Sequence, residues 1–498
     1  MAAAPITADY TQRDYASILA SLLDHATLRV PEWTDRSAND LGRLLLETTA
    51  YSADVILYYL DRLAAESFPN TASERRSVID LLSLIGYTLA TPAAAAADLQ
   101  LTFPNDSNLP VTIQIGARFA TKAAPGKPPI EFVFLPQAGV DTTIVRSGAG
   151  GQVTAQISAR QATRVVAEIV GRSTGEANQT LVLKQTPVIL PRDPESQEVL
   201  EVEVDPGTGL ERWTKRATLL YSLSGDKHFI TRVRDTDEVE IVFGDGTYGA
   251  VPPPNAEVRA TYLIGGGSTG NVGPGTITEV KSGVSVTGTC TNPLAASGGA
   301  DRETLENARR QAPLVFRSLQ RAVTATDYAV LAQSVEGVAR AVAIAPGWNY
   351  VDLYVVAAGI AAPSVDLQAR LLTFFSSRKS VTTLLNVRAP VFVNVSCSLS
   401  VGIEPNFYQA DVLRRVHDAI QALFTIERLE FGQTFYSSKL FEAAELVAGV
   451  AFVQLTLFQG ARSTTGQVVA SNNGVLALQA HEFPKLTSLV LTPQGGLA

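Results

Sequence analysis

The stretch Ile241-Val-Phe-Gly-Asp-Gly-Thr-Tyr-Gly-Ala-Val-Pro-Pro-Pro254 decides how the middle of this chain folds. Apolar residues alternate with glutamates up to Phe243, which is typical of a half-buried strand. A second alternating run follows from Val258 to Ile264. Glycine adopts the positive φ angles of a tight turn without steric cost. The pattern therefore predicts a β-hairpin whose turn contains Gly244, Asp245, Gly246 and Gly249.

A glycine-rich segment, Gly265-Gly-Gly-Ser-Thr-Gly-Asn-Val-Gly-Pro-Gly275, follows the second run. It satisfies two short motifs, the G-x-G-x-x-G of dinucleotide-binding proteins and the G-x-S-x-G of hydrolases. Both motifs require a helix directly after the strand, whereas the run from Thr276 to Val280 is β-prone. We interpret Gly267 and Gly270 as turn residues of a loop between strands, and we assign no cofactor and no catalytic residue.

Composition limits the class of protein. A chain of 498 residues should form about two to four domains, and a hydrophobic content of 46% excludes global disorder. The net charge of −8 gives no basic surface for nucleic acid. The sequence contains no run of about 18 apolar residues, so no membrane span is expected, and its start lacks the pattern of a signal peptide. We therefore expect a cytoplasmic protein. We also expect no metal site, since Cys290 and Cys397 lie far apart in the sequence and neither forms a metal-spaced pair.

Residues 1–92 are predicted to form a helical domain. Thr11, Ser37, Thr71 and Thr324 each precede an acidic residue by three positions, which predicts helix starts there. In the long helix expected from Ser37 to about Phe68, apolar residues cover more than one face. One interpretation is a three-helix bundle, and the other is that surplus apolar surface contacts another chain. On the second interpretation, the candidate interface residues are Leu44, Leu45, Tyr51, Tyr58 and Tyr59.

The remaining chain predicts a multidomain α+β protein. Short alternating runs separated by turn residues predict a central antiparallel β-domain over 97–295, which includes the glycine-rich hairpin. Residues 296–337 are expected to be a helical connector. The alternation of strands and helices over 338–460 predicts an α/β domain of the split βαβ kind, and 461–498 a tail of short strands.

Arginines gather in the connector of this otherwise acidic chain. Glu303 and Glu306 lie among them, so one interpretation is a solvated, internally paired face. The alternative is a contact for an acidic partner, for which Arg309, Arg317 and Arg321 are the candidate residues. A second group of charged residues consists of Asp235, Asp237 and Glu238. It lacks the residue spacing of a calcium-binding loop, so we interpret these residues as part of a turn.

Several short motifs follow one another along the chain. They are Asp40-Leu-Gly42, Leu46-Glu47, Ala50-Tyr51, Tyr58-Tyr-Leu-Asp-Arg62, Glu66-Ser-Phe68, Leu84-Ile-Gly-Tyr87, Phe243-Gly-Asp-Gly-Thr-Tyr-Gly249, Gly267-Ser-Thr-Gly-Asn-Val272, Gly298-Gly-Ala-Asp-Arg-Glu-Thr304, Ala312-Pro313, Phe316-Arg317 and Arg321-Ala-Val-Thr-Ala-Thr-Asp-Tyr328. In this order they resemble the baseplate J-like wedge proteins of contractile phage tails and related injection systems. The resemblance covers roughly residues 7–460, and the run of the last three motifs is the most specific match.

The resemblance implies a structural protein without catalytic residues. Such proteins form the baseplate ring around the central hub and relay the trigger for sheath contraction. The implied partners are other wedge subunits, a second copy or a paralogue, and hub, spike and sheath-proximal proteins. Assembly in the cytoplasm would then be followed by incorporation into a tail or injection particle. Two alternatives stay open: a β-rich receptor- or glycan-binding fibre, and a cell-wall hydrolase, for which the sequence offers no paired carboxylates or zinc ligands.

Overall fold

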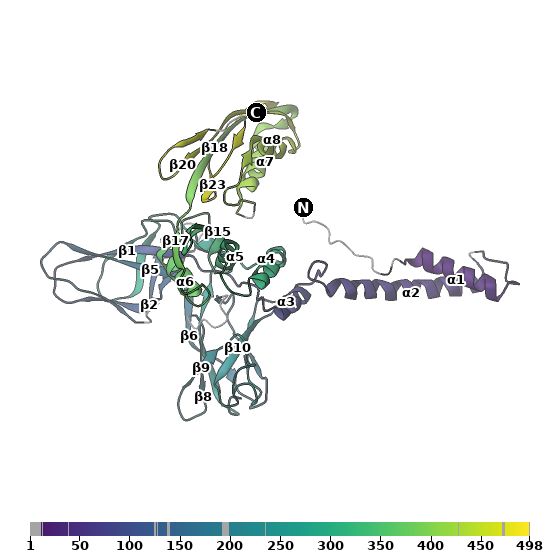
Figure 1. Cartoon of the computed structure of the whole chain (residues 1–498), viewed down its shortest axis with the longest axis horizontal. Helices are drawn as coiled ribbons and strands as arrows, with labels where there is room; N and C mark the ends of the chain where they lie inside the picture. The colour runs from purple at the N-terminus through teal and green to yellow at the C-terminus, as the bar shows by residue number, and fades with distance from the viewer. Residues whose placement is uncertain are drawn as a thin grey trace. The chain divides into compact units, whose positions relative to one another are not determined.

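The computed structural model of the chain describes residues 11 and 13–497 apart from 38, 124, 125, 127, 137–139, 192–198, 235, 427 and 471–473 (Figure 1). Asp235 therefore lies outside the described residues. Two compact units are present. Unit 1 consists of the chain up to Leu89 together with Thr304–Phe316, and unit 2 of Ala90–Glu303 together with the chain from Arg317 onward.

Unit 1 is helical. Its elements are α1 (Tyr15–Arg29), α2 (Leu41–Glu66), α3 (Arg75–Leu84) and most of α4 (Leu305–Ser318). The predicted capping residues of the first two helices, Thr11 and Ser37, are three residues too early, because Asp14 and Asp40 are the N-caps. Asp14 accepts a hydrogen bond from the N–H of Ser17, and Asp40 accepts one from Arg43, both at 2.9 Å. Aspartate is among the best N-cap residues, so Asp14 and Asp40 serve as the caps in place of Thr11 and Ser37, which lie three positions earlier.

Unit 2 begins with an antiparallel sheet of seven strands among the described residues. The order is β13-β2-β3-β5-β1-β14, with β4 paired to β2. Leu99, Leu101 and Phe103 alternate along β1 and are buried in its core. The strands are β1 (Ala96–Pro104), β2 (Val111–Thr121), β3 (Glu131–Phe134), β4 (Thr142–Ile144), β5 (Gln152–Arg160), β13 (Ile277–Val284) and β14 (Thr289–Thr291).

A second seven-stranded sheet has the order β6-β12-β8-β9-β10-β11-β7 in the described part of the chain. Its pairs are antiparallel except β9 with β10. The ring of Trp213 packs edge-on against that of Phe243, with centroids 5.1 Å apart. The strands are β6 (Ala162–Arg172), β7 (Thr180–Val182), β8 (Glu201–Asp205), β9 (Glu211–Lys215), β10 (His228–Val233), β11 (Val239–Phe243) and β12 (Glu257–Gly265).

The predicted hairpin of β11 and β12 is wrong. The two strands belong to one sheet, but β8, β9 and β10 lie between them. The reason lies in the segment that connects β11 to β12. It includes Pro252, Pro253 and Pro254, which have no N–H group to donate to a neighbouring strand. The backbone of its first half forms hydrogen bonds with other loops of the sheet. The N–H of Ala250 donates to Asp226 at 2.8 Å, and the carbonyl of Gly244 accepts from Asn178 at 3.1 Å.

The glycine turn itself is present as a compact loop. Asp245 Oδ1 accepts hydrogen bonds from the N–H groups of Tyr248 at 2.6 Å and Thr247 at 2.8 Å, and these bonds hold the pKa of Asp245 below its usual value. Gly246 and Gly249 have φ angles of +86° and +87°. Gly244 is required for a different reason: a Cβ there would lie 2.2 Å from the carbonyl oxygen of Gly249.

The chain continues with a three-stranded sheet of order β15-β16-β17 in the described residues. Strands β15 and β16 are antiparallel, whereas β16 and β17 are parallel and α6 crosses between them. This β-α-β crossover is the arrangement predicted for this region. The elements are α5 (Ala325–Gln333), β15 (Val338–Gly347), β16 (Tyr350–Ala357), α6 (Val365–Ser376) and β17 (Leu384–Arg388).

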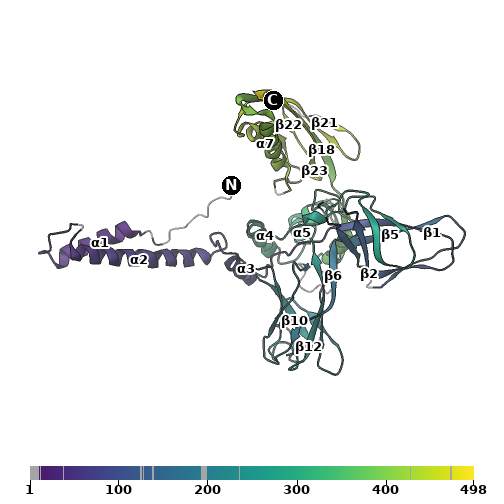
Figure 2. The same cartoon turned by 180° about the vertical axis from the view of Figure 1, so that it is seen from behind.

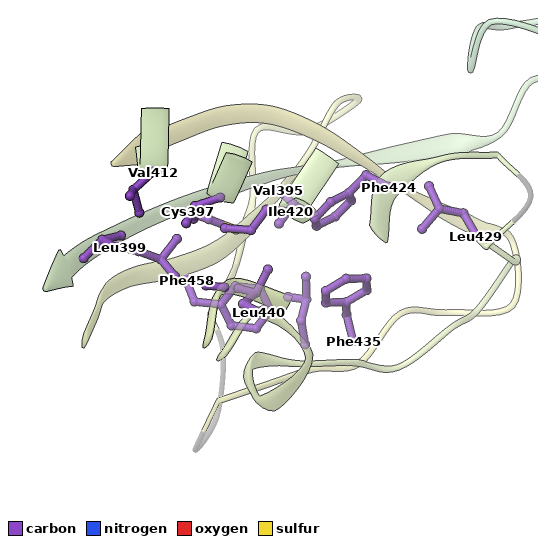
Figure 3. Close-up of a cluster of buried hydrophobic side chains, with 14 of the residues drawn as sticks. Val395, Cys397, Leu399, Val412, Ile420, Phe424, Leu429, Phe435, Leu440 and Phe458 are labelled. Carbon is purple, nitrogen blue, oxygen red and sulfur yellow. The ribbon is translucent and has the colours of Figure 1, made fainter. Parts of the chain in front are cut away.

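A last sheet, of order β21-β20-β18-β23, packs one face against α7 and α8 (Figure 3). Its core joins Cys397 of β18, Ile420 of α7 and Leu440 of α8, and the rings of Phe424 and Phe435 stack 4.8 Å apart. The elements are β18 (Val391–Tyr408), α7 (Gln409–Gln421), β19 (Phe435–Tyr436), α8 (Ser437–Glu445), β20 (Val450–Arg462), β21 (Val468–Ala470), β22 (Val475–Leu476) and β23 (Glu482–Leu497).

The predicted fold class is confirmed: helices come first, β-sheets follow, and α/β regions end the chain. The predicted tail of short strands is wrong in one respect, because β23 is 16 residues long and runs parallel to β18. Pairing with a long strand from earlier in the chain extends it, which local sequence does not indicate. Among the described helices, none combines the length and apolar character needed to cross a bilayer.

A buried ion-pair network joins the first sheet to the three-stranded sheet. Asp366, in the first turn of α6, accepts from Arg160 of β5 at 2.9 and 3.2 Å and from Arg370 at 3.1 Å. Burial disfavours its charge, but Arg160 and Arg370 outweigh that effect and keep the pKa of Asp366 below its ordinary value of 3.8. The network thus connects strands and a helix that are 206 residues apart in sequence.

Replacing Gly244 by alanine is expected to destabilise the second sheet by about 1–3 kcal/mol, since the new methyl group would overlap the carbonyl of Gly249. Hydrogen exchange of the β11 amides measures this loss. The matched control is Gly225→Ala in a neighbouring loop, where a Cβ meets nothing within 4 Å. Equal protection of β11 in the two variants would contradict the steric role of Gly244.

Replacing Asp366 by asparagine removes the buried carboxylate that Arg160 and Arg370 share, and Arg370 keeps only its longer contact with Glu336 at 3.9 Å among its printed ion pairs. Breaking such a pair typically costs about 3–5 kcal/mol, so β5 and α6 should exchange their amide hydrogens faster. Because the folded-state pKa of Asp366 is lowered, its stabilisation is present above pH 3.8 and disappears as the pH falls below it. The difference between wild type and variant should therefore shrink as the pH falls below 3.8 and through the lowered pKa of folded Asp366.

The control for this variant is Asp411→Asn. The Asp411 carboxylate also pairs with two arginines, Arg414 and Arg415, but on the exposed side of α7. Surface pairs contribute little, so this variant should exchange like the wild type. A D366N protein whose β5 and α6 exchange no faster than in D411N would refute the structural role of the network.

Candidate functional site

The helical hairpin of α1 and α2 is the candidate site, because its sequence motifs and its exposed apolar side chains coincide. The two helices lie side by side in both views (Figures 1 and 2). At the end of the hairpin opposite its connecting loop, the N–H and hydroxyl of Thr11 donate to the Asp61 carboxylate at 3.0 and 2.9 Å. This bond places the start of α1 beside the end of α2, so the helices are antiparallel.

The motif Asp40-Leu-Gly42 shapes the start of α2. Asp40 caps the helix and also accepts from the indole N–H of Trp33 at 3.1 Å. A Cβ at Gly42 would lie 2.8 Å from the Trp33 ring, so only glycine leaves room for it. The cap, the indole and the glycine together fix the connection between the helices.

At the other end of α2, Glu66 fixes the start of α3. Its carboxylate accepts from the N–H and hydroxyl of Ser73 at 2.8 and 2.6 Å, and Arg62 pairs with Glu74 at 2.8 Å. Burial of Glu66 raises its pKa, but the Ser73 bonds outweigh this and lower the pKa to about 2. The hydrogen bonds of Glu66, which we call the Glu66 clamp, therefore fix the position at which α2 ends and the chain leads into α3.

The outer face of α2 is apolar and uncovered. Among the described residues of this helix, Ala50 is the buried one. Leu41 and Tyr59 stand nine residues to either side of it, about two and a half turns, so they point the opposite way. Their side chains are 69% and 64% exposed. We call the residues on and beside this side the outer face: Leu41, Leu44, Leu45, Tyr51, Val55, Ile56, Tyr58, Tyr59 and Leu63.

The five α2 residues predicted from sequence all lie on the outer face, some near its centre and some along one edge. Leu45 and Tyr59 lie near its centre, whereas Leu44, Tyr51 and Tyr58 lie along one edge, and all five are more than half exposed. The rings of Tyr58 and Tyr59 contact edge to face, 5.6 Å between centroids. Leu41, Val55, Ile56 and Leu63 also belong to the face and were not among the predicted residues. Their periodicity was the available signal, but helical spacing alone does not separate a covered face from an open one.

Two hydroxyl groups that lie between the outer-face residues are already hydrogen-bonded within the helix. The hydroxyl of Thr48 donates to the carbonyl of Leu44 at 2.8 Å, and that of Ser52 donates to Thr48 at 2.9 Å. A satisfied hydroxyl costs much less to bury than a free one. The face can therefore enter a dry interface without leaving these two donors unpaired.

The predicted arginines belong to both units and have different surroundings within each. Arg309 donates to the carbonyl of Ala72 and so helps to hold α3 against α4, where Val78 and Leu82 pack on Ala308 and Ala312. Arg302 pairs instead with Asp237 of unit 2. Arg317 and Arg321 are exposed.

The glycine-rich segment after β12 has a structural role that the motifs do not indicate. A short 3₁₀ turn (Ser268–Gly270) and then β13 follow the strand, so the segment is a loop, as the sequence predicts. The N–H of Gly267 donates to Ala93 at 2.9 Å, and a Cβ at Gly270 would lie 2.8 Å from the Ala95 methyl group. We call the backbone meeting point of Gly266, Gly267, Gly270, Gly298, Gly299 and Gly337 the glycine junction.

The two family-like glycine motifs face each other in this junction. A Cβ at Gly299 would lie 2.5 Å from the carbonyl oxygen of Gly267. The side chain of Asn271 exchanges two hydrogen bonds with the backbone of Gly299, at 2.7 and 2.9 Å, and Asp301 accepts from the N–H of Ser268 at 2.9 Å. Gly298 in turn donates to Ala358 at 3.0 Å. The loops thus tie the sheets of unit 2 together.

The described residues hold no cluster of three or more His, Cys, Asp or Glu side chains placed to bind a metal ion. The two thiols are poor nucleophiles: burial raises the pKa of both Cys290 and Cys397 to about 12, so they are protonated at neutral pH.

Comparison with known proteins gives related results. Residues 14–84 match the family model described as bacteriophage baseplate protein, N-terminal domain. The chain is 24% identical over 309 residues to the baseplate wedge protein gp6 of Enterobacteria phage T4. This match covers 57% of the chain and 44% of the phage protein, so it spans less than half of that relative.

Two solved structures are also similar. One is a chain of the anti-feeding prophage baseplate, with 12% identity, a TM-score of 0.31 and coverage of 95% of this chain and 90% of that chain. The other belongs to the TssK-TssF-TssG baseplate subcomplex of a type VI secretion system, with 8% identity, a TM-score of 0.35 and coverage of 70% and 96%. TM-scores of this size do not establish a shared fold.

The family match and the helical hairpin coincide, since residues 14–84 contain α1, α2 and α3. In its N-terminal domain, and over somewhat more than half of its length, the chain is therefore similar to baseplate proteins of the wedge type.

Proposed function

We propose that the chain is a structural, non-enzymatic wedge subunit of the J-like type in the baseplate of a contractile tail or injection system. In this role it forms part of the ring around the hub and spike and relays the trigger for sheath contraction. Its partners are other wedge subunits, including a second copy or a paralogue, and hub- and sheath-proximal proteins. It assembles in the cytoplasm and remains in the particle.

The observation that carries this proposal is the outer face of α2. Leu41, Leu45, Thr48, Ser52, Val55 and Tyr59 follow one another at steps of four and three residues, the spacing of a coiled-coil seam. Fully burying a large apolar side chain contributes about 1.5–3 kcal/mol, which favours a helical bundle with a partner. The family match lies over the same helices.

A second candidate function, binding of glycans, rests on exposed aromatics in the second sheet. Tyr221 and Tyr248 lie on its loops, and Tyr221 is 87% exposed. Aromatic rings with a polar edge suit sugar faces. A glycan array probed with the full chain distinguishes the candidates, because a wedge subunit should bind no sugar.

Changing both Leu44 and Leu45 to aspartate is expected to block assembly. Burying two unpaired carboxylates in an apolar interface costs several kcal/mol, so incorporation into rings should fall by about a hundredfold or more. The measurement is electron microscopy and mass spectrometry of particles from the native producer carrying the variant.

The control adds the same two charges to exposed positions of α1, as Ala20→Asp with Ser21→Asp. This variant should enter particles normally. Rings that form at wild-type yield with folded L44D/L45D protein would exclude the outer face as the assembly surface.

A further inference from the structure

Two neighbouring loops of unit 2 present exposed cations and apolar side chains together. The N–H of Ala322 donates to the carbonyl of Arg378 at 3.0 Å, and Ala322 forms a parallel bridge with Lys379. These contacts hold residues 317–323 beside residues 376–382. We call the exposed residues of these loops, together with the half-buried Lys379, the arginine patch: Arg317, Leu319, Arg321, Val323, Lys379 and Val381.

The backbone of the patch is in an unfavourable conformation at two consecutive residues. Leu319 and Gln320 have φ angles of +47° and +56°, in the left-handed region that residues with a Cβ disfavour. The turn is closed by Ser318, whose hydroxyl and carbonyl accept from the N–H groups of Gln320 at 3.3 Å and Arg321 at 2.9 Å. Glycine would form this turn more easily.

Leucine at position 319 therefore needs another explanation. Its side chain is 73% exposed, so it adds little to the core of the described residues. Val323 and Val381 beside it are 79% and 96% exposed. Strained backbone and exposed apolar side chains at one place are typical of a binding surface.

The patch also presents positive charge in a chain that is acidic as a whole. The whole chain carries a net charge of −8, yet Arg317 and Arg321 are exposed cations, and the structure gives neither an ion pair with a described carboxylate. The acidic group at the patch, Asp327, accepts from the N–H of Thr324 at 2.7 Å as part of the capping box of α5. Burial raises the pKa of Asp327, but the Thr324 bonds, helped by the nearby Arg317 charge, outweigh this and lower it. Lys379 adds a further cation, although its ammonium group donates to the carbonyl of Thr383.

We propose that the arginine patch binds an acidic segment of another protein whose apolar side chains pack on the apolar side chains of the patch. Arginine forks suit carboxylates, and Leu319, Val323 and Val381 supply the apolar contact. Single-stranded nucleic acid is the less suitable ligand, because no patch residue is an aromatic on which bases could stack. The proposal does not depend on the chain being a baseplate subunit.

The test is selection of random linear peptides on the full chain. The retained peptides should be rich in aspartate and glutamate interspersed with leucine, isoleucine or phenylalanine, and added salt should weaken them. They should bind Arg317→Glu with Arg321→Glu about a hundredfold more weakly, tenfold for each reversed charge. The matched control, Arg76→Glu with Arg414→Glu, reverses two exposed arginines elsewhere and should bind like the wild type.

A second variant separates binding from folding. Leu319→Gly removes the side chain and relieves the strained φ, so the thermal midpoint should stay or rise while peptide affinity falls about tenfold. Retained peptides without acidic enrichment, equal losses in the control pair, or unchanged affinity in L319G would each overturn the proposal. Competition by single-stranded poly(dT) at equal charge would overturn it in favour of nucleic acid.

Discussion

The close approach of backbones at the glycine junction is the constraint on which unit 2 depends. A Cβ at Gly299 or Gly270 would overlap atoms that come from loops far away in sequence. Because no side chain separates these loops, their backbone groups can bond directly, as Gly267 does with Ala93. The buried Asp366 network adds a second connection between the same regions, through charge instead of close packing. Together these two connections explain why the sheets form one compact unit.

Unit 1 has the opposite character. Its α3 and α4 have a small core of their own, whereas α2 leaves most of its large apolar side chains in water. Exposing them costs free energy that folding of the chain alone does not recover, which supports the proposal that this helix lies in an interface. Its fixed ends are consistent with this purpose, because the Asp40 cap and the Glu66 clamp set where the apolar helix begins and where the chain leaves it.

Some features of the fold were predictable from local sequence. The capping box of Thr324 and Asp327 is confirmed, and the glycine-rich loop after β12 lacks the helix that a phosphate or nucleophile motif needs. The hairpin was not predictable, because two alternating runs and a turn look alike whether their strands pair with each other or with distant strands. The candidate interface residues stay a prediction. The structure adds that Leu44 and Tyr59 are exposed, but exposure does not identify a partner.

The sequence by itself determined the helices, the strands and the fold class, because caps, turns and hydrophobic periods act over a few residues. It also indicated the apolar surplus of α2, since composition on a helix face is local. Tertiary structure alone decided which strands are neighbours, which glycines meet, and that Arg160 and Asp366 form a buried pair. These features join residues up to 206 positions apart, and their free energy depends on distances that exist only after the chain has folded.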